Sequence, residues 1–365
     1  MGKCPVLMGV SLNSSHKYPE KLQNNFWDTK NLRFFREFVG ILETNIMKAL
    51  ITGGLGFVGS NLAHKLASIG VDVTVIDAMI PDLGGNYFNI DKIKEKITVI
   101  EGDIRDKNII EESIKHKDVI FHLAGQVDHK RSINRPYEDA SIRIDGTLSV
   151  LEACRKHNPS AKIIYSSTRG VYGEPKKVPV NEDNPTNPLV MYAITSLAAE
   201  NILKMYGKFY GTKTTILRLV NIYGPRHQMK HSYGIANYFI MQSLSHKPMT
   251  IMGTGKILRD FLFVDDACDA FIECSKNSGT DGKIFNVGSG KGTSFIELAN
   301  EIKNATDGKV NLVKYTKVEK QLEPGNFIAD ITKITNETKW CPKTKLGDGI
   351  KKTVDFYNKN KKHYW

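Results

Sequence analysis

The chain has 365 residues, 41% of them hydrophobic and 25% charged, which is the balance of a globular protein long enough to bury a large core. Its formal net charge of +12 comes from scattered lysines and not from one basic helix with interleaved aromatic residues, so we expect no nucleic acid partner. Every apolar run ends well short of the roughly 20 residues that a membrane span needs, so we expect no membrane association.

Cysteine usage points to a reducing compartment. The five cysteines are Cys4, Cys154, Cys268, Cys274 and Cys341; they form no CxxC pair, and an odd number cannot close into a complete disulfide framework. We therefore expect a cytoplasmic protein. No cluster of His, Cys, Asp and Glu has metal-ligand spacing, so we expect no metal. Residues 1–46 lack strong patterning and are predicted to be an N-terminal extension whose role the sequence does not reveal.

From Met47 onward, short apolar runs alternate with segments of helical periodicity. The strand-like segments are 47–53, 72–78, 97–104, 118–125 and 162–168, and the helical ones between them are 60–70, 107–116 and 139–157. A repeated strand, helix and strand pattern predicts an α/β fold whose parallel sheet is covered on both faces.

Beyond about residue 220 the pattern becomes irregular, with turn-rich stretches such as "YGPRHQ" and "MGTGK" between helices. We therefore predict a doubly wound Rossmann domain over residues 47–222, to which residues 255–282 return. Residues 223–254 and 283–365 are expected to form a smaller, less regular substrate-binding domain.

A glycine-rich turn joins the first predicted strand to the first predicted helix. In "ITGGLGFVGSNLA" the turn contains Gly53, Gly56, Phe57, Val58 and Gly59. Glycines allow a tight backbone turn and close approach to a pyrophosphate, which the N–H groups at the start of the helix bind. Asp77 ends the second strand about 20 residues later, where a carboxylate binds the adenosine ribose. Because it would repel a 2′-phosphate, NAD is favoured over NADP. A purely structural turn with a surface Asp is the alternative.

The ordered motifs of the chain resemble those of the extended short-chain dehydrogenase/reductase family, and within it the nucleotide-sugar epimerases and dehydratases. The resemblance runs from Met47 to about residue 335. It rests on the motifs "TGGLGFVGSNL", "GDIRD", "HLAGQV", "SSTRGVYG", "YAITS", "LRLVNIYGPR", "RDFLFVDDACDA" and "FNVGSGKGTS". The last of these looks like a second phosphate loop, but the resemblance implies a structural turn between a strand and a helix.

The resemblance implies further cofactor contacts. Asp103 and Ile104 would flank the adenine, and Leu123, Ala124 and Gly125 would lie along the NAD after the fourth strand. Two alternatives remain open from the residues alone: Asp103 caps the following helix, or Gly125 merely ends a strand.

The resemblance also implies the reacting groups and the substrate contacts. Thr168 matches the Ser/Thr that donates to the reacting sugar hydroxyl, and Tyr192 matches the catalytic base. The positions of Asn221 and Arg259 bind the nucleotide diphosphate, and Arg226 is a further candidate, because a guanidinium forms two parallel charge-assisted bonds with phosphate.

The chain departs from the family at Ser196, where the family has a lysine four residues after the catalytic Tyr. A free Tyr has a pKa near 10 and needs a nearby cation to act as a base at neutral pH. Three alternatives are open: the nicotinamide ring and a nearby Arg, with Arg169 as the candidate, supply the charge; the substitution inactivates the enzyme; or the chain is a non-catalytic homologue that binds nucleotide-sugars.

Three more departures concern the reaction type and the contacts. Dehydratases of the family carry an Asp-Glu pair after the catalytic Thr, but this chain has Arg169 and Gly170, which disfavours a 4,6-dehydratase. Glu323 occupies the place of an Arg that helps to bind diphosphate, and Arg143 replaces an Asn near the cofactor.

These patterns together predict an NAD-dependent enzyme that epimerises a nucleotide-diphospho-sugar through a transient keto-sugar and resembles the UDP-glucose 4-epimerases. The alternatives are a 4,6-dehydratase or other oxidoreductase, and a weakly active or non-catalytic homologue. The resemblance further implies a homodimer.

Overall fold

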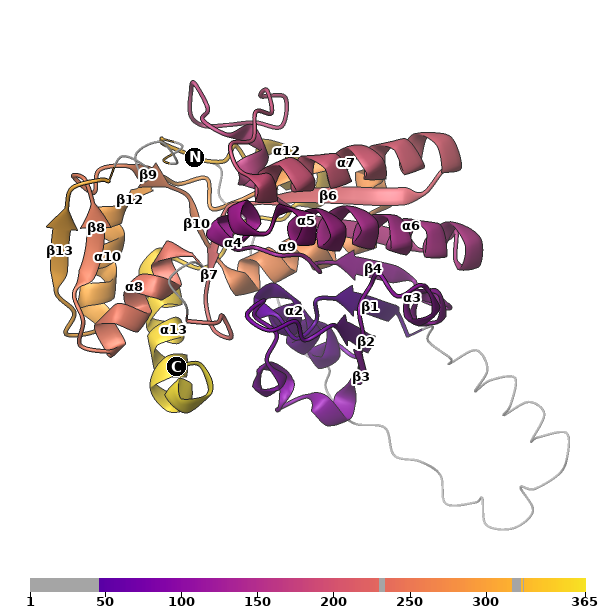
Figure 1. The fold of residues 1–365 in the computed structure, drawn as a ribbon, viewed down its shortest axis with the longest axis horizontal. Helices are drawn as coiled ribbons and strands as arrows, with labels where there is room; N and C mark the ends of the chain where they lie inside the picture. Colours follow the sequence, from indigo (N-terminus) through magenta and orange to yellow (C-terminus); the bar gives the residue numbers. More distant parts are fainter. Residues whose placement is uncertain (1–45, 230–233, 317–322, 324) are drawn as a thin grey trace, which may run out of the picture. The chain divides into compact units, whose positions relative to one another are not determined.

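The largest sheet in the described residues is parallel and has the strand order β3-β2-β1-β4-β5-β6-β11. Figure 1 shows its strands β3, β2, β1 and β4 next to one another. The structure is a computed structural model that describes residues 46–229, 234–316, 323 and 325–365. The strands are β1 (Lys48–Thr52), β2 (Asp72–Asp77), β3 (Thr98–Glu101), β4 (Val119–His122), β5 (Lys162–Thr168), β6 (Lys213–Leu219) and β11 (Ile284–Val287). The order reverses between β1 and β4, which is the point where sheets of this type bind ligands.

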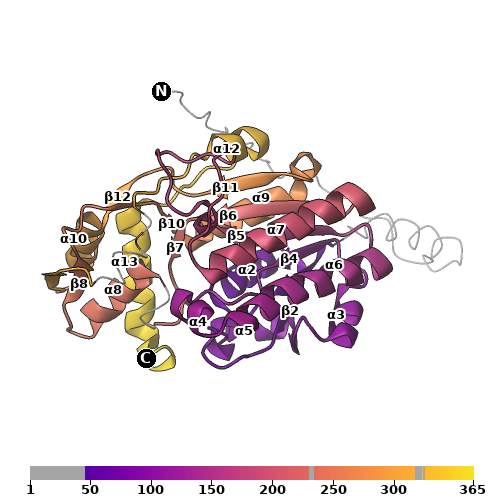
Figure 2. The ribbon, with the colours of Figure 1, turned by 45° about the horizontal axis from the view of Figure 1, so that its top comes forward.

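Helices cover both faces of this sheet (Figure 2). One face carries α3 (Lys107–Ile114), α6 (Gly146–His157) and α7 (Met191–Tyr210), and the other carries α2 (Phe57–Ser68), α9 (Val264–Lys276) and α12 (Thr332–Thr338). Because both faces are buried, the strands are apolar almost throughout, as "ALIT" in β1 and "VIFH" in β4 show. The predicted Rossmann architecture is therefore confirmed.

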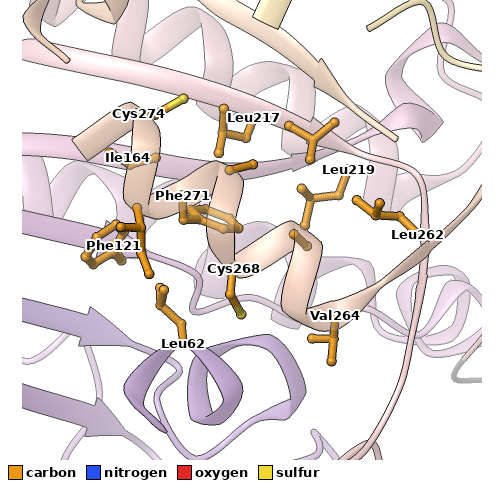
Figure 3. Close-up of a cluster of buried hydrophobic side chains, with 14 of the residues drawn as sticks. Leu62, Phe121, Ile164, Leu217, Leu219, Leu262, Val264, Cys268, Phe271 and Cys274 are labelled. Atoms are coloured by element: carbon orange, nitrogen blue, oxygen red, sulfur yellow. The ribbon is translucent and has the colours of Figure 1, made fainter. Parts of the chain in front are cut away.

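Helix α9 shows how the second face is packed. It places Cys268 and Phe271 between the sheet and α2, where they meet Phe121 of β4, Leu217 of β6 and Leu62 (Figure 3). The rings of Phe121 and Phe271 pack edge to face, with centroids 6.2 Å apart. Full burial of one such side chain contributes about 1.5–3 kcal/mol. Residues 264–276 thus pack on the sheet.

The helix predicted over residues 139–157 is longer and is not uniform. It begins as α5 (Pro136–Ala140), passes through a π-helical turn (Ser141–Asp145) and continues as α6. Pro136 starts it because the first turn of a helix needs no N–H donor there. Such π turns insert one extra residue and often occur at functional sites. This turn contains Arg143.

Helix α7 runs next to α6 across one face of the sheet (Figures 1 and 2). It starts after Val190, which has extended backbone, and ends at Gly211, which adopts the left-handed conformation with φ of 70°. Glycine is the residue that most easily ends a helix in this way. The helix therefore presents Tyr192 in its first turn, near the carboxyl ends of the strands.

The smaller lobe has its own core. It contains α8 (Ile235–Leu244), α10 (Phe295–Ala305), α13 (Leu346–Asn360) and the parallel pair β8 (Met249–Met252) and β13 (Val310–Val313). Helix α10 begins with a capping box in which the side chains of Ser294 and Glu297 bind each other's backbone N–H groups. Two short pairs connect the lobes: β7 (Asn221–Tyr223) with β10 (Phe261–Phe263), and β9 (Leu258–Arg259) with β12 (Thr293–Ser294).

The remaining described elements are short. They are α4 (His129–Asn134) and the 3-10 turns Tyr87–Ile90, Lys94–Lys96, Arg169–Tyr172, Ser278–Thr280 and Lys361–His363. Among the helices that the structure describes, none combines the length and the apolarity that a membrane crossing requires.

One predicted boundary differs from the structure. Residues from 283 onward were expected in the smaller domain, but β11 pairs with β6 and completes the large sheet, with Ile284 opposite Ile216. The reason is that "IFNV" is a short buried run, which adds a parallel strand to the exposed edge of β6. Residues 46–365 form one compact unit, so the division into two domains stays a prediction. The predicted extension lies outside the described residues except for Ile46.

Candidate active site

A cavity of about 600 Å³ lies at the carboxyl ends of β1, β4 and β5 and extends to the smaller lobe. Fifteen of the residues predicted for the site line it: Gly53, Gly56, Phe57, Val58, Gly59, Asp77, Asp103, Ile104, Leu123, Ala124, Gly125, Thr168, Tyr192, Asn221 and Arg259. Ser196 and Arg226 are not among the lining residues. The predicted residues come from segments far apart in the sequence, so the fold itself assembles this cavity.

The glycine turn forms one wall of the cavity and has no room for side chains. Gly53 has a φ of 70°, and its N–H donates to the carbonyl of Ile76 at 2.8 Å. A Cβ added to Gly59 would lie 2.2 Å from the carbonyl oxygen of Gly53, so only glycine fits there. Gly56, the N-cap of α2, places no side chain over the helix start. The turn therefore fits a dinucleotide pyrophosphate, with the N–H groups of the first turn of α2 facing it.

Asp77 stands beside this turn, held by the backbone. Its carboxylate accepts hydrogen bonds from the N–H groups of Leu55 and Met79, each at 3.0 Å. Burial raises the pKa of Asp77, while these two bonds act in the opposite direction. The carboxylate is thus oriented at the end of β2, where a ribose diol would be bound.

At the adenine end, Asp103 pairs with Arg105 and does not cap α3. Its two carboxylate oxygens accept from Nε and Nη2 of Arg105 at 2.9 and 2.5 Å, and these bonds lower the pKa of Asp103. The N-cap of α3 is Asp106, which accepts from the N–H groups of Asn108 and Ile109. The helix-cap alternative for Asp103 is therefore wrong.

The part of the cavity wall that follows β4 is held in place by Thr52. The N–H groups of Leu123 and Ala124 donate to Oγ1 of Thr52 at 3.2 and 3.1 Å. Thr52 is also bonded to Nδ1 of the buried His122, whose pKa burial lowers to about 3. A neutral His122 thus supports the cofactor strand and is not exposed to a ligand.

Thr168 and Tyr192 reach the same cavity from different elements. Thr168 is the last residue of β5, and its Oγ1 accepts from the N–H of Gly170 at 3.1 Å. The ring of Tyr192 stacks on that of His129, with centroids 5.1 Å apart. This pairing of a hydroxyl and a phenol beside a dinucleotide cradle is suited to proton removal from an alcohol during hydride transfer.

Ser196 does not line the cavity, although it stands where the family has a lysine that serves the catalytic Tyr. Its side chain is fully buried, and its Oγ donates to the carbonyl oxygen of Tyr192 at 2.7 Å within α7. A short side chain at this position is satisfied by its own helix and does not reach the cavity wall. Ser196 is therefore a packing residue in this structure and cannot contact a ligand in the cavity.

Arg169, the predicted replacement cation, lines the cavity but faces the smaller lobe. Its guanidinium lies 5.2 Å from the ring centroid of Phe327. Burial and the charge of Arg259 lower the pKa of Arg169 to about 9, so it remains cationic at neutral pH. The two neighbouring guanidinium groups give this end of the cavity a positive character suited to an anion.

The substrate contacts predicted from "LRLVNIYGPR" and "LRDFLFVDD" are only partly present in the cavity. Asn221 lines it while its amide donates to the carbonyl of Asp260 at 3.1 Å. Arg259 is buried and forms an ion pair with Glu323, stacked 5.5 Å from the ring centroid of Phe295. Glu323, which stands where the resemblance implies an Arg, thus pairs with Arg259 and adds no second positive charge.

Arg226 lies outside the cavity. It adopts a φ of 69°, and its Nη1 donates to Oδ1 of Asn61 in α2 at 2.7 Å. Its guanidinium also stacks over the ring of Phe356 in α13, 5.6 Å from the centroid. Arg226 therefore joins the two lobes in this structure, and its predicted role as a substrate ligand stays a prediction.

The structure adds one residue whose role the sequence did not identify. Arg143 lines the cavity although it is only 4% exposed, and its guanidinium carbon lies 5.1 Å from the ring centroid of Tyr192. The only signal in the sequence was the departure from Asn at this position. Its location opposite α7 could not be read from spacing along the chain.

Comparison with known proteins agrees with this arrangement. The model of the NAD-dependent epimerase/dehydratase family matches residues 49–288. The chain belongs to this family. Its cofactor is accordingly NAD, which the glycine turn and Asp77 fit.

Individual relatives cover nearly the same region. The UDP-glucose 4-epimerase of Mycolicibacterium smegmatis is 33% identical over 313 residues, which are 85% of this chain and 98% of that protein. The UDP-glucose 4-epimerase of Thermotoga maritima, solved with UDP-glucose, is 32% identical with a TM-score of 0.79 and covers 86% of this chain and 99% of its own. That of Thermus thermophilus, solved with NAD, is 29% identical with a TM-score of 0.76 over 86% and 99% of the chains.

Proposed function

We propose that the protein is an NAD-dependent epimerase of nucleotide-diphospho-sugars, with UDP-glucose and UDP-galactose as its substrate pair. The observation that carries the proposal is that Thr168 and Tyr192 meet the dinucleotide cradle in one cavity that ends at Arg259 in the second lobe. Relatives that act on UDP-glucose align over almost the whole cavity-forming region.

The carboxylates of the cavity argue against a dehydratase. In the described part of the chain, Asp77, Asp103 and Asp128 are the acidic residues that line the cavity. The first two lie at the adenosine end, and the third caps α4 by accepting from the N–H groups of Lys130 and Arg131. Loss of water from the sugar would need an acid and a base besides Tyr192. The cavity holds no such pair next to Thr168.

The proposal gives a role to the glycine turn and to five of the predicted side chains that line the cavity. NAD, held by the glycine turn and Asp77, would supply reversible hydride transfer with the sugar carbon. Thr168 orients the reacting hydroxyl, and Tyr192 removes and later returns its proton. Asn221 and Arg259 bind the diphosphate. The glycine turn holds the pyrophosphate, and Asp77 holds the ribose of the cofactor.

The test is to incubate the purified protein with UDP-glucose and to identify the product by NMR and mass. We expect UDP-galactose at unchanged mass, with UDP-N-acetylglucosamine and TDP-glucose as comparison substrates. A 4-keto-6-deoxy product with loss of water would replace the proposal with the dehydratase alternative. Binding of NAD without turnover of any nucleotide-sugar would support the non-catalytic homologue.

We also propose a homodimer formed through the outer face of α7. Ile194, Met205, Phe209 and Tyr210 are exposed on this helix, with Phe209 at 70%. The first three are spaced by whole turns, so they form one apolar stripe along the helix. Light scattering should give twice the mass of the chain, and Phe209→Glu should give the monomer, whereas Leu312→Glu on β13 should not. A monomeric wild-type protein would contradict this.

Two further proposals concern the environment of the protein. A reducing, cytoplasmic location is supported by Cys154, Cys268, Cys274 and Cys341, which are all free thiols in the described residues. The absence of a nucleic acid partner remains a proposal from the scattered lysines.

A further inference from the structure

Helix α7 carries no lysine four residues after Tyr192, although a tyrosine base needs a nearby cation. A different cation, Arg143, lies over the ring of Tyr192. Position 196 is Ser, buried and bonded within α7. The guanidinium of Arg143 comes from the neighbouring π-helical turn and lies 5.1 Å from the centroid of the Tyr192 ring. The two departures from the family pattern, at positions 143 and 196, thus meet at one side chain.

Arg143 is held firmly in this position. Its Nη2 donates to the carbonyl oxygen of Gln126, and its Nη1 donates to the hydroxyl of Tyr165 at 3.4 Å. A Cβ on Gly125 would lie 2.8 Å from Nη1, so a side chain there would require the guanidinium to shift. The strand-end glycine and the arginine therefore depend on each other.

One polar group of Arg143 has no partner within the described structure. Its Nε is buried without a hydrogen-bond acceptor, although the residue lines the cavity. An unsatisfied buried donor on a charged group is energetically costly. The guanidinium group thus keeps hydrogen-bonding capacity that the described protein does not use.

We propose that Arg143 takes over the work of the family's lysine: it stabilises the phenolate of Tyr192 by its charge and binds a hydroxyl of the nicotinamide ribose. The cation has moved from α7 to the turn that precedes α6, and Ser196 fills the position that the lysine has left. This inference rests on the proposed function, because it assigns a positioning residue to the same reaction.

The other groups near Tyr192 are less suited to this work. The pKa of His129, whose ring stacks on Tyr192, is lowered by desolvation and by Arg169, so it is neutral at pH 7 and above. Arg169 interacts with Tyr192 by charge but stacks on Phe327. Tyr165 is a phenol bonded to Arg143 itself. Arg143 is the cation that stacks on the Tyr192 ring.

Substitutions at positions 143 and 196, alone and together, test this proposal. Arg143→Asn should lower turnover about 100-fold, the lower range for general-base catalysis, and move the acid limb of the pH–rate profile to higher pH. Ser196→Lys in the same chain should recover at least about ten-fold by restoring the family's arrangement. Ser196→Lys alone should give no gain, because it places two cations at one phenol. The matched control is Arg135→Asn, an exposed arginine on the same helical segment that pairs with Glu138.

A measurement without cofactor or substrate separates this inference from the proposed function. The part of the tyrosinate absorbance titration that disappears in Tyr192→Phe should move to higher pH in Arg143→Met, which keeps the length but not the charge, and stay in place in Arg143→Lys. Circular dichroism verifies folding of each variant. An unmoved titration in Arg143→Met, or a large gain from Ser196→Lys alone, would overturn the inference. If wild-type protein turned over no nucleotide-sugar, the proposed function would fail while this titration would still decide the role of Arg143.

Discussion

The two ends of the cavity are prepared for their ligands in different ways. At the cofactor end, backbone N–H groups hold Asp77, and glycines clear the space that a pyrophosphate would fill. At the substrate end, the buried cation Arg259 is already engaged by Glu323. The cofactor end is therefore preorganised, whereas a diphosphate that binds Arg259, as we propose, would first have to displace a carboxylate. Binding of NAD should be tight and binding of the sugar nucleotide weaker.

Between the two ends lie Thr168 and Tyr192, the pair that we propose to react with the sugar hydroxyl. The largest effect is expected for Tyr192→Phe, which removes the proton acceptor and should lower turnover by about 1,000-fold. NAD binding should be unchanged, because the glycine turn and Asp77 are intact. Steady-state kinetics and the NAD content of the purified protein measure the two effects. Turnover within ten-fold of wild type would remove Tyr192 from its proposed role.

At the cofactor end, Gly59→Ala should weaken NAD binding by about 100-fold, which equals about 2.7 kcal/mol. The added Cβ would lie 2.2 Å from the carbonyl oxygen of Gly53, so the turn must open. Calorimetric titration with NAD gives the affinity.

The control is Gly207→Ala in α7, where a Cβ meets nothing closer than 3.5 Å. This change should leave NAD binding intact and raise helix stability by up to about 1 kcal/mol. Equal NAD affinities for Gly59→Ala and wild type would show that the turn does not hold the pyrophosphate.

The free energy of unfolding should depend on pH through His122, which lies behind the cofactor end of the cavity. His122 has a pKa of about 3 in the folded protein and 6.5 as its ordinary value, so only the unfolded chain binds a proton between these values. The contribution of neutral His122 to the free energy of unfolding is therefore fully present above pH 6.5. It decreases as the pH falls and is about 2 kcal/mol smaller at pH 5.

Urea unfolding of wild type, His122→Gln and the partly exposed His157→Gln at pH 7 and pH 5 measures this contribution. The difference in the free energy of unfolding between pH 7 and pH 5 should be about 2 kcal/mol smaller in His122→Gln, and unchanged in His157→Gln. The same dependence in all three proteins would exclude His122 as its source.

At the substrate end, Glu323→Gln should release Arg259 and lower the KM for UDP-glucose by about 5- to 10-fold, roughly 1 kcal/mol, with little change in kcat. Glu337→Gln is the matched control, because Glu337 also pairs with a cation, Lys283 at 2.7 Å, and this cation, unlike Arg259, does not line the cavity. An increase in KM would show that Glu323 itself contributes to substrate binding.

The same contrast separates what the sequence could predict from what it could not. The cofactor end is built by turns that directly follow strands, so periodicity and glycine spacing were enough to place Gly59 and Asp77. The substrate end depends on backbone direction: Arg226 matched a motif, but its left-handed turn directs it to Asn61. Arg143 could be seen only as a departure from the family, since its approach to Tyr192 joins two separate helices.

In the proposed reaction, a hydride would pass from the sugar carbon to NAD and back within one cavity. UDP-glucose deuterated at C4 tests it most directly, with NMR of the product and absorbance of NADH followed in the same reaction. We expect UDP-galactose that keeps the deuterium at C4, with no accumulation of NADH. Deuterium lost to solvent, a dehydrated product, or net NADH would contradict the proposed function.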